Sequence, residues 1–254
     1  MSSLLCSVLR GAVLFACVTA VTVGAQAQTE PVSDWEKSVR RIVDRWIEAT
    51  GMNEPLGQRC IKVLATASDP KGTLIKVHGH WKSASDYTVK QVRNGATMVD
   101  AGRFAGRVFR FHPGLGDYEV LEPEEKSPVM TLLAALSNRS LYTMVQDAAR
   151  ITVGSVAEIA GAECDRLAVN DTAGFDFDLF VSKQTGRPSA LDFTIQGKSM
   201  RILYSDWESQ KAGEQSFSKM KLVQGPREME FSVRKLELVD AQPTVPGVVQ
   251  AEID

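Results

Sequence analysis

The sequence predicts a mainly β protein with helices, an α+β chain whose strands form an antiparallel meander. From Gln58 onward, polar and apolar residues alternate with period two in short segments rich in β-branched and aromatic residues. Turn signals such as Asp69-Pro70-Lys71-Gly72 and Asn94-Gly95 separate these segments. Ahead of them, apolar residues recur at three- and four-residue spacing, which is the period of a helix.

This first helix is expected over residues 34–50. Asp34 can accept hydrogen bonds from the first-turn amides, and Gly51 provides a left-handed stop. Charged residues fill one face, and the apolar face must cover another part of the protein. That face consists of Trp35, Val39, Ile42, Val43, Trp46 and Ile47.

Two more helices are expected in the middle of the chain. After Glu122-Pro123-Glu124-Glu125, a helix is predicted over 127–138, and this segment carries no charge. A helix without charges is normally buried or laid against an apolar surface. A third helix is expected near 141–149.

The strands are expected in two groups, one on each side of these helices. The tail at about 243–254 has little periodicity, and no repeat or linker divides the chain, so 28–254 is expected to be one domain. The expected strands are 59–68, 73–82, 86–93, 96–103, 107–112, 117–121, 151–159, 164–169, 175–182, 189–196, 200–205, 216–223 and 229–238.

The N-terminus reads as a cleavable signal peptide, residues 1–27. Arg10 precedes the apolar run GAVLFACVTAVTVG, which is too short to span a bilayer comfortably. Ala25-Gln26-Ala27 supplies the cleavage pattern, so the mature protein should begin near Gln28 in the periplasm. A retained membrane anchor is one alternative. A lipobox at Leu14-Phe15-Ala16-Cys17, with a lipid on Cys17, is another.

The charge composition excludes nucleic acid as a partner. With 29 basic and 31 acidic side chains, the protein lacks the positive field that nucleic-acid binding requires.

The sequence leaves two alternatives for the cysteines of the mature protein. Only Cys60 and Cys164 follow the signal peptide. In an oxidising compartment they are a candidate disulfide, although two separate buried thiols are the alternative.

Catalytic and metal sites find little support in the sequence. His78 and His80 share a strand face, and His112 could add a third zinc ligand, but scattered surface histidines are commoner. Asp176 and Asp178 also share a face, opposite large apolar residues, and are expected to face water. No G-x-S-x-G or phosphate-binding glycine loop occurs. We therefore expect no enzymatic activity, no catalytic or metal-binding residues and no cofactor.

Several segments resemble the periplasmic lipoprotein-carrier superfamily, with its LolA/LolB-like fold. They are AGAECDRLAVND, FDFDLFVSKQTGRPSALDFTI and SMRILYSDW, with the motif residues Gly161, Cys164 and Leu167, the turn Thr185-Gly186-Arg187-Pro188, and Asp206-Trp207. They are most similar to an uncharacterised family of predicted periplasmic proteins within that superfamily. FAGRVFRFHPGLGDYEVLEPE resembles a strand pair of the same family, with Ala105 where that family usually has Asp.

The resemblance implies a curved antiparallel sheet, a half-barrel, covered on its concave side by helices. In the carriers, the apolar cavity between sheet and helices takes up lipoprotein acyl chains. The basic residue that carriers use in this cavity has no counterpart that the sequence identifies. The candidate ligand-binding residues are Ile75, Val77, Trp81, Phe109, Phe111, Met130, Leu133, Leu136, Phe177, Leu179 and Phe193.

Two functions follow as expectations. The first is a periplasmic carrier, a monomer that holds a lipid or the acyl chain of a lipoprotein in an apolar cavity. The second is an envelope interaction or sensor module of the same fold, which binds a protein partner and no lipid. An ordinary packed core would use the same residue types as the cavity.

Overall fold

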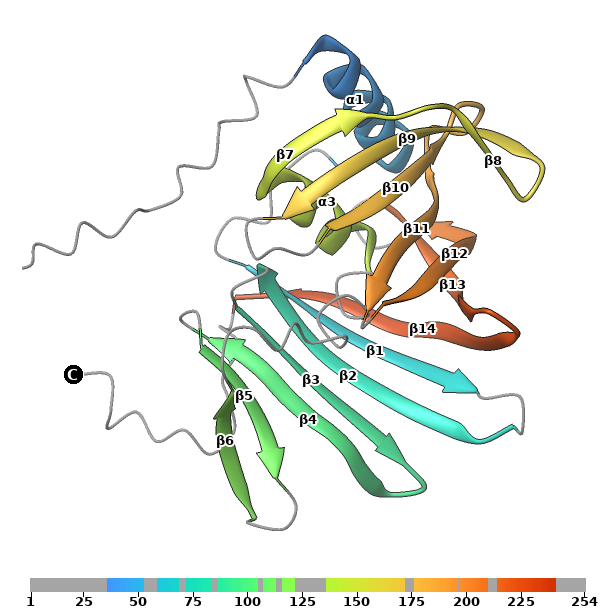
Figure 1. Ribbon diagram of the computed structural model, residues 1–254. Coiled ribbons are helices and arrows are strands. Elements are labelled where there is room, and N and C mark those ends of the chain that lie inside the picture. The colour runs from blue at the N-terminus through green and yellow to red at the C-terminus, as the bar shows by residue number, and fades with distance from the viewer. Residues whose placement is uncertain are drawn as a thin grey trace, which may run out of the picture.

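A computed structural model of the chain defines its fold (Figure 1). The expected signal peptide and the tail at 243–254 lie outside the residues that it describes. It describes residues 36–52, 59–68, 72–83, 86–104, 107–112, 116–121, 136–171, 176–195, 197–209 and 214–240.

Two helices lie within the described residues. Helix α1 is Lys37–Thr50, and Gly51 ends it in the left-handed conformation at φ 67°, as expected. Helix α3 is Asn138–Gln146. It begins earlier than the sequence indicated because the hydroxyl of Ser137 accepts a hydrogen bond from the Ser140 amide at 3.1 Å, which caps the first turn. Neither helix is long and apolar enough to cross a membrane.

The strands confirm the predicted mainly β class. Residues expected to form one strand at 151–159 form two, β7 and β8, because the chain leaves the ladder between Val153 and Ala157. The strands are β1 Cys60–Ser68, β2 Leu74–Ser83, β3 Asp86–Arg93, β4 Ala96–Phe104, β5 Arg107–His112, β6 Asp117–Leu121, β7 Ala148–Val153, β8 Ala157–Ile159, β9 Ala162–Asp171, β10 Asp176–Ser182, β11 Pro188–Ile195, β12 Lys198–Ser209, β13 Gln215–Gln224 and β14 Arg227–Val239.

All of these strands belong to one antiparallel sheet of 14 strands. Its order is β6-β5-β4-β3-β2-β1-β14-β13-β12-β11-β10-β9-β7, with β8 also paired to β9. Two meanders are therefore joined where β1 pairs with β14, for example Ile61 with Leu238. Strands β6 and β7 end the sheet and do not pair with each other, so the described sheet is open.

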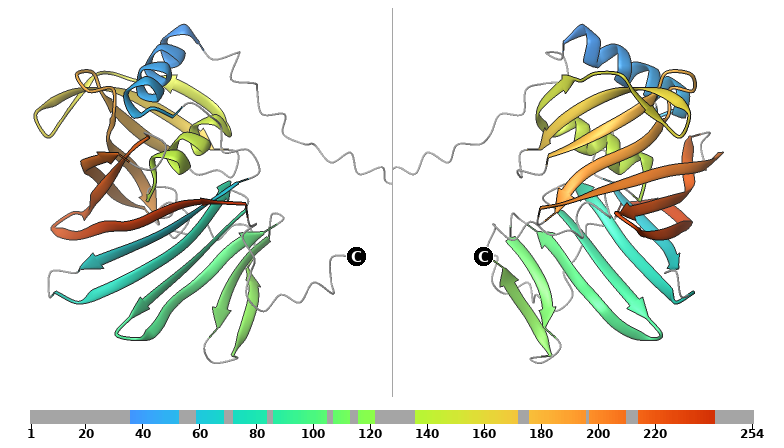
Figure 2. Two further views of the ribbon diagram at one scale, coloured as in Figure 1. Left: turned by 180° about the vertical axis from the view of Figure 1, so that it is seen from behind. Right: turned by 45° about the vertical axis from the view of Figure 1, so that its right-hand side comes forward.

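The position of α3 shows that this sheet is strongly curved. Helix α3 contacts β2 and β9, although six strands lie between them in the sheet order. In a flat sheet those two strands would be about 34 Å apart, whereas a helix is only about 10 Å wide. The two halves of the sheet therefore bend toward α3, as the views in Figures 1 and 2 show.

The main core lies on one side of the sheet, which we call the core face. It receives side chains from both helices and from both halves of the sheet, including Trp46, Trp81, Leu141, Leu179 and Phe231. The opposite side, the outer face, carries a separate small cluster of Ile159, Cys164, Phe180 and Ala190.

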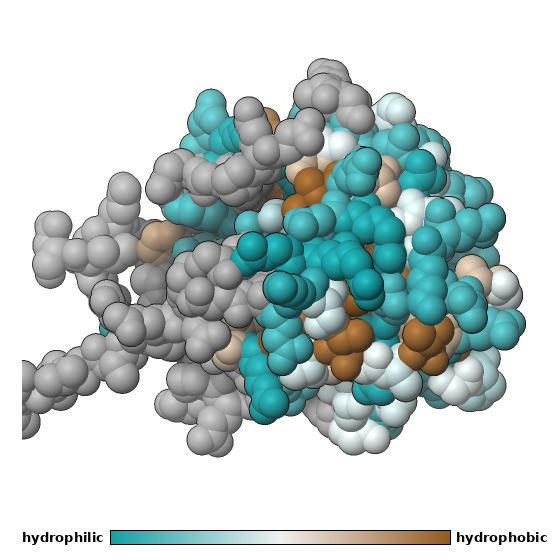
Figure 3. All heavy atoms as spheres, turned by 90° about the horizontal axis from the view of Figure 1, so that it is seen from above, coloured by the Kyte–Doolittle hydropathy of each residue, from teal (hydrophilic) through white to brown (hydrophobic). Residues whose placement is uncertain are grey.

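The outside of α1 is polar, which fits its amphipathic sequence. Lys37, Arg40, Arg41 and Asp44 alternate with the buried residues of the helix. Seen from the side on which α1 lies, the surface is largely hydrophilic with isolated apolar side chains (Figure 3). The apolar stripe of α1 is thus used in packing against the rest of the protein.

A candidate ligand-binding face on the sheet

Seven of the eleven candidate ligand-binding residues meet on the core face. Ile75 is partly buried there, and the other six are at most 6% exposed, so all seven join one apolar cluster. They come from β2, β10, β11 and the turn before α3, which are far apart in the sequence. These residues are Ile75, Val77, Trp81, Leu136, Phe177, Leu179 and Phe193.

Phe109 and Phe111 do not reach this face. Strand register places Phe109 opposite Gly102, whereas Ala101, which packs against the main core, is opposite Arg110. Because successive side chains alternate between the two faces of a strand, Phe109 and Phe111 lie on the outer face. There the ring of Phe111 contacts Tyr118, with ring centroids 5.4 Å apart. We correct the expectation that these two phenylalanines line the same cavity.

The remaining candidates come from the expected charge-free helix at 127–138. Met130 and Leu133 lie outside the described residues. Leu136 is described and fully buried, and the chain from it leads directly into α3.

The core face also contains large side chains that the sequence did not single out. Tyr204, Phe217, Met220 and Phe231 come from the central strands β12, β13 and β14, and all are at most 8% exposed. The alternation in 200–205 and 216–223 was visible in the sequence. This alternation does not show which face of each strand lies on the same side of the sheet as the candidate residues of β2 and β10.

At the Asp206-Trp207 pair, the backbone of β12 changes the alternation of its side chains. Asp206 takes a positive φ of 51°, which residues other than glycine adopt rarely. The strand alternation therefore shifts at this point, and Tyr204 and Trp207, three residues apart, both contact the ring of Phe217. Their ring centroids lie 4.4 and 5.6 Å from that of Phe217. The shift gives the core face one more aromatic side chain than strict alternation would.

Two hydrogen-bond donors are buried on the core face with no partner in the described part of the chain. They are the indole Nε1 of Trp81, a residue 1% exposed, and the hydroxyl of Tyr204, a residue 8% exposed. Burial raises the pKa of Tyr204 well above its ordinary value, so this phenol stays neutral. Buried donors normally find an acceptor, so each marks a place where an acceptor oxygen would be favourable.

The Thr185-Gly186-Arg187-Pro188 turn anchors α1 on the sheet. It joins β10 to β11, and Gly186 has φ 70°. A Cβ atom on Gly186 would lie 2.8 Å from the Cβ of Ala49 and 2.9 Å from the carbonyl oxygen of Arg45. Glycine is therefore required twice, by the backbone conformation and by the close approach of the helix.

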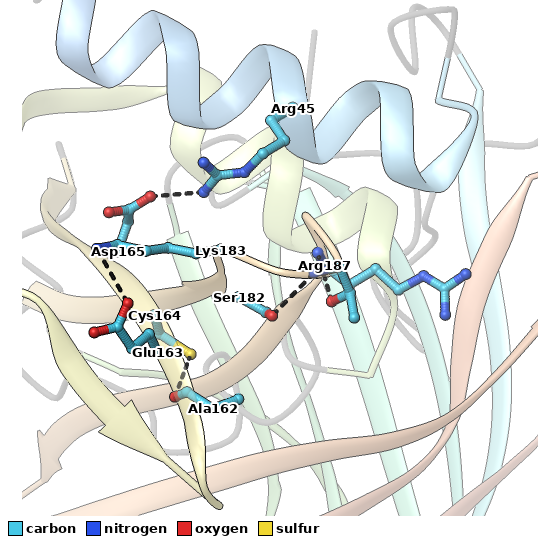
Figure 4. A network of polar contacts seen from close by, with 9 residues as sticks. Arg45, Ala162, Glu163, Cys164, Asp165, Ser182, Lys183 and Arg187 are labelled. Atoms are coloured by element: carbon cyan, nitrogen blue, oxygen red, sulfur yellow. Dashed lines mark hydrogen bonds and ion pairs between the residues drawn. The ribbon is translucent and has the colours of Figure 1, made fainter.

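An ion pair holds the same part of α1 to β9. Arg45 Nη2 lies 2.6 Å from Asp165 Oδ2, and the two side chains are 32% and 13% exposed. Nearby, the Lys183 amide donates to the Glu163 carbonyl at 2.9 Å, which ties the turn to β9 (Figure 4). The helix position is thus determined by residues of the motif that carried the resemblance.

The two helices are also linked to each other and to β13 by buried polar contacts. Trp46 Nε1 of α1 donates to Asn138 Oδ1 of α3 at 2.8 Å. Asn138 Nδ2 donates to the Gln215 carbonyl oxygen at 3.4 Å. Next to it, Arg139, 7% exposed, forms an ion pair with Glu214. These contacts hold the start of α3 over the core face.

The histidines are not brought together. His78 and His80 lie on β2, whereas His112 lies on β5, with β3 and β4 between them. Burial lowers the pKa of His80, and repulsion from Lys62 and His78 lowers it further. No group of three metal-ligating side chains is found in the described ranges.

The aspartates of β10 face water, as expected from the alternation. Asp178 forms an ion pair with Arg166 at 2.8 Å, and Asp176 is exposed. The residues that alternate with them, Phe177 and Leu179, are buried on the core face.

Cys60 and Cys164 are free thiols, so the candidate disulfide is absent from the structure. Cys60 lies on β1 and Cys164 on β9, and five strands separate these two in the sheet order. A disulfide needs two Cα atoms within about 7 Å, which distant strands do not provide. The second alternative, two separate buried thiols, describes the structure.

The fold itself is shared with known proteins. A LolA superfamily protein from Nitrosomonas europaea superposes with a TM-score of 0.56, covering 80% of this chain and 94% of that protein, at 12% identity. A Vibrio parahaemolyticus domain assigned to outer membrane lipoprotein sorting gives a TM-score of 0.50, covering 78% and 91%, at 11% identity. No protein-family model and no curated sequence matches the chain. At such low identity the likeness concerns the fold alone. The chain has the LolA-like fold that the resemblance predicted.

Proposed function

We propose that this protein is a periplasmic carrier that holds a lipid, or the acyl chain of a lipoprotein, against the core face of its curved sheet. The ligand lies between the sheet and the helices. Met130 and Leu133 remain candidate ligand-binding residues of this proposal. The carrier works as a monomer of residues 28–254 without a cofactor.

One observation carries the proposal. The core face gathers large apolar side chains from both halves of the sheet, and it also contains buried donors, Trp81 Nε1 and Tyr204 Oη, with no partner in the described chain. A surface that serves only internal packing has no use for unpartnered donors, because burying them costs free energy. A lipid supplies both apolar chain and acceptor oxygens.

The energetics of such a ligand are favourable. Each buried methylene contributes about 0.8 kcal/mol, so a chain of about fifteen methylenes gives about 12 kcal/mol before the costs of association. Those costs are about 4–15 kcal/mol. One acyl chain therefore gives net, reversible binding when the costs of association lie in the lower part of that range.

Native mass spectrometry of the exported protein tests the proposal. The full chain is expressed with its own N-terminus, and the mature protein is purified from the envelope fraction without detergent. We expect a mass of residues 28–254 plus a lipid that organic solvent removes. A clean apo mass, together with no uptake of added palmitate, would overturn the carrier function.

A matched pair of variants locates the ligand. Ala101 packs against the main core and is only partly buried, so Ala101→Phe adds bulk to the core face and should reduce the bound lipid. Ala96→Phe makes the same change at an exposed position at the start of β4 and should leave the bound lipid unchanged. Equal lipid in both variants would place the ligand elsewhere.

A second function has its own supporting observation at the sheet edge. Strand β7 ends the sheet, and Val153 and Val156 beside it are 37% and 50% exposed. An unpaired edge strand with exposed apolar residues can accept a strand from a partner protein. Under this alternative, the envelope fraction yields a stoichiometric protein partner and no lipid.

A further inference from the structure

One row of the core face carries three polar side chains on adjacent strands. Trp81 of β2 lies directly opposite Tyr87 of β3, and Tyr87 lies directly opposite Arg103 of β4. Side chains directly opposite each other in an antiparallel pair have Cβ atoms about 4.5–5.5 Å apart. The indole, the phenol and the guanidinium therefore stand side by side.

All three side chains point to the core face. Trp81 and Tyr87 are 1% and 2% exposed and belong to the main core. Arg103 lies two residues after Ala101, which packs against the same core, and the ladder between β3 and β4 is regular there. A two-residue step keeps a side chain on the same face of a strand. The positive charge of Arg103 also acts on Tyr87, whose pKa burial raises and this charge lowers.

The ring of Trp81 is held in place by its neighbour. It stacks on Tyr87 with ring centroids 5.8 Å apart and an interplanar angle of 21°. Its Nε1 has no hydrogen-bond partner within the described residues. The indole therefore presents a fixed donor to the core face.

The chemistry of the row selects its ligand. An indole N–H and a guanidinium are donors only, and a neutral phenol can donate its proton. Such a set is complementary to acceptor oxygens, and the permanent charge of Arg103 favours oxygens that carry a negative charge. The neighbours of the row are apolar: Ile61 lies opposite Trp81 on β1, and Val108 lies opposite Arg103 on β5. The oxyanion must therefore belong to a molecule that is otherwise apolar.

We propose that Trp81, Tyr87 and Arg103 form a subsite for the anionic head group of a lipid whose chain lies along the apolar core face. This assignment rests on the carrier function proposed above and names its ligand class. The head group is a carboxylate or a phosphate, and the two have the same acceptor chemistry.

Calorimetric titration with three probes of equal chain length tests the subsite. The delipidated mature protein is titrated with palmitic acid, hexadecyl phosphate and hexadecanol. Because hydrogen bonds to charged groups are the stronger ones, we expect at least one anionic probe to bind about ten-fold or more tightly than the alcohol. The better of the two anions identifies the head group. Inorganic phosphate alone should not bind measurably.

Three variants and a control test whether Trp81 and Arg103 cause the preference for the anionic probe over the alcohol. Arg103→Met and Trp81→Phe should reduce the preference for the anion to about three-fold or less, because each removes a donor and keeps apolar bulk. Arg103→Lys keeps the charge and should retain most of the preference. Arg93→Met removes an arginine from β3, about 20 Å along that strand from Tyr87 and opposite Ile75 of β2. It should change nothing.

The outcomes separate this subsite from the carrier function. If all three probes bind equally, the subsite is overturned and the carrier stands. If none binds, both proposals fail. A preference that survives Arg103→Met and Trp81→Phe in folded protein, or tight binding of inorganic phosphate by itself, also overturns the assignment.

Discussion

Trp46 and Asn138 form the hydrogen bond that joins the two described helices, with Nε1 and Oδ1 2.8 Å apart. The two residues are 0% and 2% exposed and come from positions 92 residues apart. Asn138 Nδ2 also donates to the sulfur of Met52 at 3.2 Å, so both the oxygen and the nitrogen of the side-chain amide form hydrogen bonds. The bond therefore fixes α3 relative to α1 above the core face.

Removing the indole N–H from this bond should destabilise the protein. Trp46→Phe leaves the Asn138 carbonyl oxygen buried without its donor, which costs about 1–3 kcal/mol, and a further loss comes from the smaller ring. We expect the free energy of unfolding in urea to fall by about 3 kcal/mol. Ser218→Ala removes an exposed hydroxyl that donates to the Asp206 carbonyl, and should cost less than about 1 kcal/mol. Equal losses would contradict the structural role of the Trp46 bond.

Gly186 and Gly197 offer a matched test of the helix contact. Both have positive φ, 70° and 73°, but a Cβ on Gly186 would meet α1 whereas one on Gly197 would meet nothing within 4 Å. Gly197→Ala should cost only the conformational strain, about 1–2 kcal/mol. Gly186→Ala should cost clearly more, about 3 kcal/mol or above. Thermal unfolding of the two variants checks the difference. The added Ala49→Gly change should recover part of the loss at Gly186, and its failure to do so would argue against the contact.

The Arg139–Glu214 pair should behave as a buried ion pair. Its side chains are 7% and 17% exposed, and Arg139 Nε also donates to Glu214 Oε2 at 2.8 Å. Glu214→Gln leaves the guanidinium buried without its counter-charge and should cost about 3 kcal/mol or more. The double variant Arg139→Met, Glu214→Leu should be closer to the wild type than either single change. Glu228→Gln breaks a more exposed pair with Lys221 and should cost much less than Glu214→Gln, because solvent screens the exposed pair. Additive effects in the double variant would exclude a coupled pair.

Much of the fold could be predicted because local signals agreed with the tertiary structure. Asn94-Gly95 predicted a hairpin turn, and both residues have the positive φ that such a turn needs, 50° and 80°. Gly51 ended α1 as expected. The two-residue period also predicted that Phe177 and Leu179 would be buried on one face of β10 and that Asp178 would lie on the other face. This pattern could be predicted because it depends on the sequence of one strand alone.

The parts that could not be predicted depend on relations between distant segments. The pairing of β1 with β14 brings together residues such as Cys60 and Val239, which no local pattern connects. Phe109 has the right residue type for a cavity, but its face is set by the register between β4 and β5. The inward position of Arg103 depends on register in the same way, and for that reason the sequence could not identify it as a basic residue on the core face.

The two cysteines should remain unreactive thiols in the native protein. Burial raises the pKa of both Cys60 and Cys164, so little of the reactive thiolate is present at pH 8. We expect iodoacetamide to leave the native mature protein unmodified, and to add two groups once the protein is unfolded without reductant. Intact mass measures both results. An unfolded protein that resists alkylation until a reductant is added would show that the two thiols are joined.

Stability at alkaline pH should depend on Tyr87. Burial, opposed by the charge of Arg103, raises the pKa of Tyr87 from 10.0 to about 12 in the folded protein. A raised pKa means that the folded state holds its proton when the unfolded state has lost it. The stabilisation is therefore complete below about pH 10 and is lost as the pH rises toward about 12, at about 1.4 kcal/mol per pH unit. Tyr87→Phe removes this titration, so the free energy of unfolding in urea should decline less steeply between pH 9 and 11.5 than in the wild type.

Tyr118→Phe is the control, because Tyr118 is more exposed and solvent screens its contribution. Parallel declines in the wild type and Tyr87→Phe would mean that the phenol of Tyr87 is accessible to water, and that the row it shares with Trp81 and Arg103 is not buried on the core face.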